Sequence, residues 1–483
     1  MYRKARPTCS EPQARPHQPR LRKPAHGIQG HPPAKTKKQG GYAITGCLVA
    51  AFLLSPLLPS TVLGQAIAPG EVLTLPHAIE IALKNQPAVM AGAYTVKANE
   101  ALIGQARSIY YPQVTAIPVF SRVSPPSTAS HGPTITTSTG ANTASGGGVG
   151  PYDLYTGTAS VSQMIYDFGR TSSQVKISTL NAQSSRHNLT ATENTVVLNV
   201  KQAYYNALQA ERNLDTAKEA VKQLREHLDQ TRTFFEVGTK TKFDVTQAQV
   251  NLSNAQLTLI QAENQMKLTR LTLSSAMAVP DAPEYRLEDL LLYTKFELSP
   301  EEAIKTAYEH RPDLKSLMKV RQAAEQSVTL AREGYLPQLN ANANYYYTGT
   351  DFPLEKGWSY GINLSIPIFN GFLTRYQVQQ AQANLAVAQQ NERNLRLTIF
   401  TQVRTDYLTL ATAAQSIMTA ADAVRQGKEN VELAAGQYQY GVGIALNVID
   451  AIVTLGNSEV AYTQALATYK NAQASIENDI GIR

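Results

Sequence analysis

Two long stretches of the chain carry apolar residues at the spacing of an α-helix that packs along other helices. They run from residue 170 to 236 and from 374 to 440, and neither contains a proline. At ~1.5 Å per residue, each predicts roughly 100 Å of helix. The apolar positions alternate steps of three and four, which is the seam of a coiled coil. The first seam consists of Val200, Ala203, Ala207, Ala210, Leu214, Ala217, Val221, Leu224 and Leu228. The second consists of Val403, Leu410, Ala413, Ile417, Ala420, Val424 and Val431, and is interrupted by Asp406 and Gly427.

These stretches belong to an internal duplication. Near the start of each copy, matching residues lie 225 positions apart, whereas from residue 165 onward the spacing is 203. The pairs include Pro87 with Pro312, Tyr204 with Tyr407, Gly238 with Gly441, and Ala248 with Ala451. The difference falls in the Ser/Thr/Gly-rich tract 124–150, which we interpret as a variable exposed loop that only the first copy carries.

Each copy has the same predicted order of helix, two strands, long helix, tight turn and shorter helix. The first copy covers residues 67–280, with strands at about 109–123 and 152–168, a long helix at 170–236 and a return helix at 244–277. A connection, residues 281–298, leads to the second copy, residues 299–483. That copy has strands at about 337–350 and 357–369, a long helix at 374–440 and a return helix at 447–480. The helix from His77 to Ser108 and the return helix together match the long helix in length, so we expect four helical columns per chain.

The strand pattern is clearest at residues 357–369, where apolar and polar residues alternate strictly. The apolar face consists of Trp358, Tyr360, Ile362, Leu364 and Ile366, and the other face of Ser359, Gly361, Asn363 and Ser365. An aromatic start followed by strict alternation is typical of a lipid-facing barrel strand. A half-buried soluble sheet is the alternative. Tyr345, Tyr346 and Tyr347 end the preceding strand and are interpreted as an interfacial girdle.

Four strands per chain are too few to close a barrel, because about eight are needed for the smallest one. Open strand edges do not occur in lipid, since their backbone groups would stay unpaired. We therefore expect the chain to oligomerise through its sheet. Two copies would supply eight strands and three copies twelve, and the strand count does not choose between them.

Residues 1–66 have the features of an export signal peptide with a long basic first part. Residues 1–40 hold ten Lys or Arg and one acidic residue, so the basic charge belongs to this leader and does not indicate nucleic-acid binding. An apolar run follows from Ile44 to Leu58. A membrane anchor is the competing interpretation, and a lipoprotein box ending at Cys47 is rejected because it precedes the apolar run. Cys9 and Cys47 are the only cysteines, so the expected mature chain has no thiol.

The order of motifs in both copies resembles the TolC-like outer-membrane efflux family, over about residues 73–481. The residues that carry the resemblance include the stretches Ile165–Gly169, Ile368–Gly371, Val237–Gly238, Phe243–Val245 and Asn447–Ala451. The resemblance implies a mainly α fold with a small β part. It also implies a homotrimer with one twelve-strand outer-membrane β-barrel, continuous with an α-helical barrel in the periplasm of a Gram-negative bacterium. The implied partners are a periplasmic adaptor and an inner-membrane transporter of RND or ABC type.

In this family the turns between long and return helices contact the adaptor and close the tube. Glycine is expected there, because helices commonly end in a left-handed residue. The resemblance assigns adaptor contact to Gly238, Thr239, Lys240, Gly441 and Val442. It assigns closing roles to Asp244 and Tyr438, and a carboxylate ring to Asp450.

The sequence departs from the family pattern at two positions of this gate. Gly443 stands where a basic residue usually bonds the closing aspartate, and Lys240 or Lys242 is a candidate substitute. Asn447 stands at a second acidic ring position, so the constriction should carry less negative charge. For Asp450, an ordinary exposed acid in the first turn of a helix is the alternative.

An enzyme finds no support in the sequence, and neither a cofactor nor a metal site is predicted. The histidines of the expected mature chain, His77, His131, His187, His227 and His310, lack ligand spacing and are expected to be solvated. Gly146–Gly150 is interpreted as loop, because it does not open a helix after a strand. The predicted function is passive, gated export through an outer-membrane tunnel. A periplasmic structural coiled coil or adaptor is the alternative, and the cargo stays open.

Overall fold

The computed structural model describes residues 68, 70–124 and 151–482. The predicted leader, most of the loop 124–150, and with it His131 and Gly146–Gly150, lie outside the described residues. Two 67-residue helices dominate the described part, α3 (Arg170–Glu236) and α7 (Leu373–Gln439). Each turns back into a 35-residue helix, α4 (Lys242–Ala276) and α8 (Ala445–Asp479).

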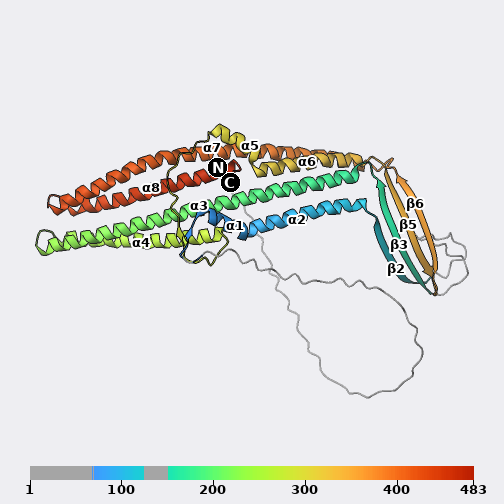
Figure 1. Ribbon diagram of the computed structural model, residues 1–483, viewed down its shortest axis with the longest axis horizontal. Helices are drawn as coiled ribbons and strands as arrows, with labels where there is room; N and C mark the ends of the chain where they lie inside the picture. Colours follow the sequence, from blue (N-terminus) through green and yellow to red (C-terminus); the bar gives the residue numbers. More distant parts are fainter. Residues whose placement is uncertain (1–67, 69, 125–150, 483) are drawn as a thin grey trace, which may run out of the picture. The chain divides into compact units, whose positions relative to one another are not determined.

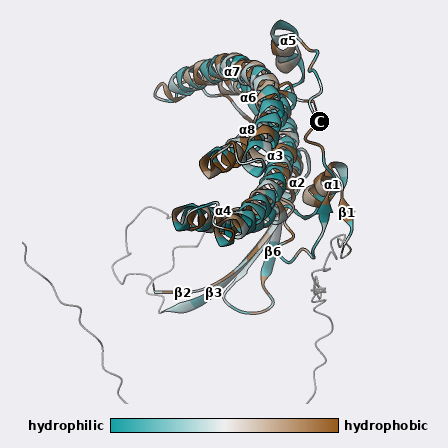
Figure 2. Ribbon diagram, turned by 90° about the vertical axis from the view of Figure 1, so that its left-hand side faces the viewer, coloured by the Kyte–Doolittle hydropathy of each residue, from teal (hydrophilic) through white to brown (hydrophobic). Residues whose placement is uncertain are grey.

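Shorter helices continue the return helices beside each long one (Figure 1). Along α3, α4 lies beside one half and α2 (Pro87–Arg107) beside the other, while α8 and α6 (Pro312–Glu333) flank α7 in the same way. Figure 2 looks along the helices and shows these six in one curved layer. The length argument from the sequence therefore gives the right neighbours.

The predicted single helix from His77 to Ser108 is wrong. It is divided into α1 (Leu75–Asn85) and α2, with Gln86 in an extended conformation at φ −63° and ψ 119°. The cause is Pro87, because a residue before proline is pushed out of the helical region. Arg311 before Pro312 has the same conformation, between α5 (Pro300–His310) and α6. In Figure 2, α1 and α5 lie on the outer side of the curved layer.

A two-stranded parallel sheet, β1 (Val72–Leu73) with β4 (Arg286–Leu287), was not predicted. Two tyrosines, one in each copy, hold the connecting segments of this region against the long helices. The Tyr204 hydroxyl donates to the carbonyl oxygen of Leu73 at 2.8 Å and lies 3.0 Å from that of Glu288. Its repeat partner Tyr407 donates to the carbonyl oxygen of Leu298 at 2.9 Å. The paired tyrosines of the duplication therefore anchor the segments that join the helices.

A partly buried group of charged residues explains why Asp406 interrupts the second seam. Arg311 bonds both carboxylate oxygens of Asp313 at 3.0 Å and lies 3.5 Å from Asp479 at the end of α8. Burial, and then the negative charge of Asp479, raise the pKa of Asp406 to about 6. Asp406 therefore faces a charged joint between α7, α8 and the α5–α6 break, where the first copy has the alanine Ala203 at the matching position.

We expect Asp406→Ala to raise the unfolding temperature at neutral pH and to weaken its pH dependence. Because the folded chain holds the Asp406 proton more tightly than the unfolded chain, this group stabilises folding progressively as pH falls from about 7 towards 4. Thermal unfolding of the detergent-extracted protein across this range measures the effect as a change in the unfolding temperature. Asp422→Ala, on an exposed face of the same helix, is the matched control. Equal pH dependence in wild type and Asp406→Ala would contradict the assignment.

The sheet next to the helices contains four antiparallel strands in the order β2-β3-β5-β6. They are β2 (Gln113–Val123), β3 (Tyr152–Tyr166), β5 (Gln338–Gly349) and β6 (Glu355–Ser365). Two predicted bounds need correction. The strand expected from residue 109 begins at Gln113, because Ser108–Tyr110 form a 3₁₀ turn. The strand expected to reach 369 ends at Ser365, before Pro367, which has no N–H to donate. Ile366 therefore lies beyond β6.

The strand register divides the sheet into an apolar and a polar face. On one face Trp358, Tyr360, Ile362 and Leu364 of β6 oppose Tyr345, Ala343, Ala341 and Leu339 of β5. The face continues through Ala159 and Val161 of β3 to Ala116 and Val114 of β2. The other face carries Asn340, Asn342 and Asn344 of β5 against Asn363, Gly361 and Ser359 of β6. Tyr346 belongs to this polar face, so only two of the three tyrosines of the predicted girdle lie on the apolar one.

Both edges of this sheet, β2 and β6, have one strand neighbour each in the described part of the chain. The apolar side chains of β6 are exposed in the single chain, for example Tyr360 at 76% and Ile362 at 75%. An edge strand with exposed apolar residues is a template for pairing with another strand. Among the described residues, none of the helices combines the length and the apolarity needed to span a bilayer.

Candidate gate at the helical tips

The turns at the ends of the long helices have the geometry that glycine favours. Gly238 and Gly441 both have φ +78°. The N–H of Thr239 donates to the carbonyl oxygen of Phe234 at 2.9 Å, and that of Val442 to Gln437 at 3.0 Å. This is the Schellman arrangement, in which a left-handed residue lets the chain leave the helix and bond its last carbonyls. The tips expose apolar side chains, with Val237 at 67% and Val442 at 80%.

Asp244 caps its own helix. Its carboxylate accepts from the Thr241 N–H at 2.9 Å and from the Thr241 hydroxyl at 2.8 Å, and its own N–H donates to that hydroxyl at 3.3 Å. The bond from the Thr241 N–H is the main cause that lowers the pKa of Asp244. Its carboxylate bonds Thr241, and the Tyr438 hydroxyl bonds Thr231 instead of Asp244. Asp244 and Tyr438 are therefore not joined by a hydrogen bond in this chain, and their roles in closing stay a prediction.

Tyr438 is the largest buried side chain of a small apolar cluster near the tips, which we call the tip cluster. It consists of Leu224, Ala434, Tyr438, Ala445, Val448, Ile449, Ala451 and Ile452. The Tyr438 side chain is 1% exposed, and its hydroxyl lies 3.0 Å from that of Thr231 on α3. The Lys240 ammonium lies 4.6 Å from the centre of the Tyr438 ring. Tyr438 thus ties the α7–α8 hairpin to the α3–α4 hairpin.

His227 contradicts the expectation that the histidines are solvated. It is 4% exposed, and its ring lies 4.9 Å from that of Tyr438. The sequence signal was its position three residues after Leu224 and four before Thr231, on the face that packs. Burial, and then the charge of Lys240, lower the pKa of His227.

A side chain at Gly443, such as the basic one of the family pattern, would be crowded by the end of α7. A Cβ there would lie 3.0 Å from the backbone carbonyl carbon of Gln437 and from the nitrogen of Tyr438. Lys240 occupies the matching position of the first copy, because 443 − 203 = 240. Of the two lysines considered as substitutes, Lys240 contacts Tyr438 while Lys242 begins α4.

Asp450 and Asn447 lie three residues apart on one exposed face of α8. The residues around them, Val448, Ile449, Ala451 and Ile452, are buried in the tip cluster. Both polar side chains therefore point away from α3. The arrangement is compatible with a ring of these residues in an oligomer, which stays a prediction.

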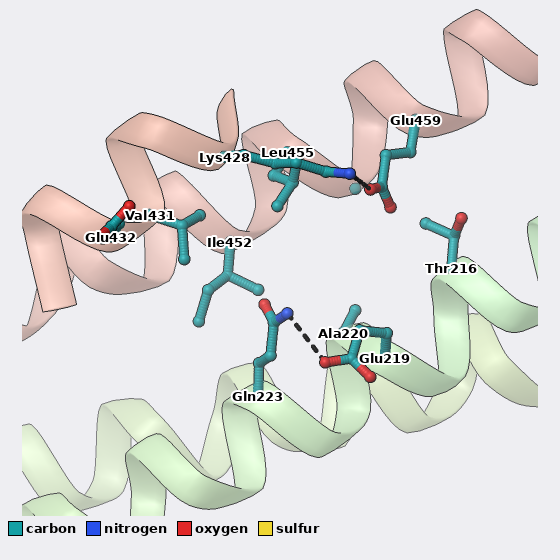
Figure 3. Close-up of a pocket in the computed structure, with 11 residues that line it drawn as sticks. Thr216, Glu219, Ala220, Gln223, Lys428, Val431, Glu432, Ile452, Leu455 and Glu459 are labelled. Carbon is teal, nitrogen blue, oxygen red and sulfur yellow. Dashed lines mark hydrogen bonds and ion pairs between the residues drawn. The ribbon is translucent and has the colours of Figure 1, made fainter. Parts of the chain in front are cut away.

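Next to the tip cluster, on its side away from the turns, a groove of about 400 Å³ with both polar and apolar side chains lies between the two hairpins. Figure 3 shows Glu219 and Gln223 of α3 facing Ile452 of α8 across it. Lys428 of α7 pairs with Glu459 of α8 at 3.7 Å beside the groove. The tip cluster is thus a separate and small point of contact between the hairpins, which is the kind of contact that opens at low cost. Among the described residues, His, Cys, Asp and Glu form no group that could hold a metal.

Comparison with known proteins decides the family. The model of the family described as "Outer membrane efflux protein" matches residues 78–279 and 303–481, one segment in each copy of the duplication. The chain belongs to this family. It is accordingly a TolC-like protein of the outer membrane of Gram-negative bacteria, from a family of channels that work in tripartite efflux and secretion systems.

Its similarity to individual family members is distant but extensive. The outer membrane efflux protein BepC of Brucella suis is 25% identical over 432 residues, 86% of each chain. TolC of Escherichia coli is 23% identical over 307 residues, which cover 60% of this chain and 62% of TolC, so the match spans less than two thirds of that relative. The crystal structure of the Campylobacter jejuni CmeC outer membrane channel has the same fold, with a TM-score of 0.69 over 84% of this chain and 21% identity.

Proposed function

We propose that three copies of this chain form an outer-membrane tunnel that passively conducts cargo and is gated at its helical tips. The observation that carries the proposal is the two-faced sheet, whose edge strands β2 and β6 each have one strand neighbour in the part of the chain that the structure describes. Lipid on the apolar face and water on the polar face suit a closed barrel, in which β2 of one copy pairs with β6 of the next. Three copies with four strands each supply twelve strands, the number that the family resemblance favours.

The helices support the same assembly. Apolar residues remain exposed along α4 and α7 in the single chain. On α4 they are Phe243, Val250, Leu257, Ile260, Leu268 and Leu271, and on α7 Val387, Leu397, Phe400, Leu408 and Met418. Phe243, Val250, Leu257 and Leu271 are separated by multiples of seven, which is the spacing of a coiled-coil seam. We assign these stripes to contacts between neighbouring copies, so that the columns close into one tube.

In this proposal the chain supplies a conduit and a gate, performs no chemistry and uses no cofactor. Energy and cargo choice belong to an inner-membrane transporter of RND or ABC type, reached through a periplasmic adaptor. The adaptor contacts the tip turns at Gly238, Thr239, Lys240, Gly441 and Val442. The alternative, a periplasmic structural or adaptor protein, leaves the exposed apolar face of β6 without an explanation.

Photo-cross-linking from the tips in living cells tests this assignment. Thr239 lies on the first turn and Gln439 is the last residue of α7 before the second turn, and both are exposed, so each accepts a photoreactive residue. Mass spectrometry of the adducts should recover a periplasmic adaptor, and its associated transporter would narrow the cargo class. Adducts with lipopolysaccharide or surface components alone would contradict the proposed orientation.

Asp450→Asn is expected to reduce the preference of the channel for cations. Three carboxylates around one axis attract cations and hold back anions. The reversal potential in planar bilayers under a salt gradient measures the change, and Asn447→Asp should shift it in the opposite direction. Selectivity that stays the same in both variants would contradict the ring.

A further inference from the structure

A titratable group that the gate described above does not use, His227, lies against Tyr438 of the tip cluster. The Nε2 atom of His227 is buried and has no hydrogen-bond partner among the described residues. The matching residue of the second copy is Asn430, which is exposed. The duplication thus has a buried imidazole at one position and a solvated amide at the other, so His227 is not a requirement of the repeated fold.

Among the charged groups near His227, Lys240 opposes a proton on the ring, and the two nearby carboxylates, Asp244 and Asp229, interact with other residues. Lys240, from the turn after α3, lies above the Tyr438 ring that His227 also contacts. The carboxylate of Asp244, at the start of α4, is bonded to Thr241. On α3 itself, Asp229 lies 3.6 Å from Arg232.

The elements of the other hairpin bring no compensating acid either. Tyr438 of α7 is neutral, and its burial raises the pKa of its hydroxyl. Glu432 of α7 and Asp450 of α8 are exposed, and Asp450 lies on the face away from α3. In the described part of the chain, no carboxylate is therefore hydrogen-bonded to His227, so none would neutralise its imidazolium form.

We propose that His227 is a proton-operated release of the tip, because a proton on its buried ring would place a second positive charge, in addition to that of Lys240, next to Tyr438. The inference rests on the proposed function, since the tip is the proposed gate. A charged imidazole without a carboxylate partner is costly where water is excluded. The release of Tyr438 from α3 would expose His227 to water and remove that cost. Protonation therefore favours separation of the α7–α8 hairpin from α3.

The direction of the pH effect depends on which state of the tip, packed or open, binds the proton more tightly. In the packed tip the pKa of His227 lies below its ordinary value of 6.5, so the packed tip binds the proton more weakly than an open, solvated tip. Acid therefore shifts the equilibrium towards the open tip, starting as pH falls through about 6.5. In the neutral range the packed tip is favoured.

The open probability of the purified full-length protein in planar bilayers tests this inference between about pH 7.5 and 5.5, the range in which histidine titrates. We expect wild type to open at least about fivefold more often at the lower pH, which is the lower end of typical coupling between two sites. His227→Gln keeps a polar side chain that does not titrate, and should remove most of the increase. Lys240→Met should reduce it. His187→Gln, a half-buried histidine on the same helix, should leave it unchanged.

A second readout separates this inference from the proposed function. Spin labels at Thr239 and Val442, one on each turn, report the distance between the two hairpin tips without any need for conductance. Acid should lengthen that distance in wild type and not in His227→Gln. Channels whose opening is independent of pH, or a pH response that persists in His227→Gln, would overturn the inference and leave the tunnel intact. Failure to conduct at any pH, with labels that still separate in acid, would overturn the tunnel and retain the release.

Discussion

Ile362→Arg is expected to abolish assembly in the outer membrane, whereas Asn363→Arg is expected to be tolerated. The two residues are neighbours on β6, but Ile362 lies on the apolar face and Asn363 on the polar face. An arginine that faces lipid near the middle of the membrane costs about 2–4 kcal/mol in a barrel, while substitutions that face the lumen tune selectivity. In a trimer the cost applies to each subunit.

The measurement is the amount of heat-resistant, detergent-extracted oligomer in outer-membrane fractions. The neighbouring variant is the control for expression and export, because it introduces the same side chain one residue away. An equal loss of oligomer in both variants would indicate that β6 tolerates arginine on neither face, which would contradict the assignment of one face to lipid and the other to water. Normal assembly of Ile362→Arg would contradict a lipid-facing β6.

Tyr438→Ala is expected to hold the tip open. The side chain is 1% exposed and fills the contact between the hairpins, so its removal leaves a cavity in the tip cluster. Deletion of a buried aromatic ring costs about 3–5 kcal/mol. This cost raises the free energy of the packed tip and not that of an open tip, so the equilibrium shifts towards the open tip. We expect the open probability to rise by more than about tenfold. A tenfold rise needs only about 1.4 kcal/mol of this cost.

Tyr440→Ala is the matched control, because Tyr440 is two residues away and 82% exposed. Substitution of such a surface residue typically changes stability by less than about 0.5 kcal/mol. Tyr438→Phe keeps the ring but loses the bond to Thr231, and should lie between wild type and Tyr438→Ala. Bilayer conductance measures all three. A closed Tyr438→Ala channel, or equal opening in Tyr440→Ala, would contradict the role of the tip cluster.

The sequence predicts the elements better than it predicts their contacts. The range of α3, and within one residue that of α7, could be read from uninterrupted apolar spacing, and the faces of β6 from its alternation. The break before Pro87 was readable too, because it recurs before Pro312 and proline disfavours helix at the preceding residue. The capping role of Asp244 follows from the spacing of Thr241 and Asp244, which is that of a capping box.

The composition of the tip cluster could not be read in the same way. Spacing identifies the packing face of a helix but not which side chains of another helix meet it. Tyr438 and His227 are 211 residues apart in the chain and come together only once both hairpins are packed side by side. The absence of a basic residue at Gly443 was visible, but the sequence did not show how closely the backbone of Gln437 and Tyr438 approaches, which would crowd a Cβ there. The oligomer that would bring three Asp450 residues together needs contacts outside one chain.

Disulfide cross-linking between the two sheet edges tests the central claim most directly. The chain has two cysteines, Cys9 and Cys47, both in the predicted leader, so cysteines placed in β2 and β6 would be the only ones in the expected mature chain. A series of paired substitutions along β2, each combined with one at Asn363, should find a register that links copies in outer membranes. The closed twelve-strand barrel predicts a covalent trimer as the largest product, with single-cysteine variants giving none. A ladder that stops at the dimer or continues beyond the trimer would contradict it.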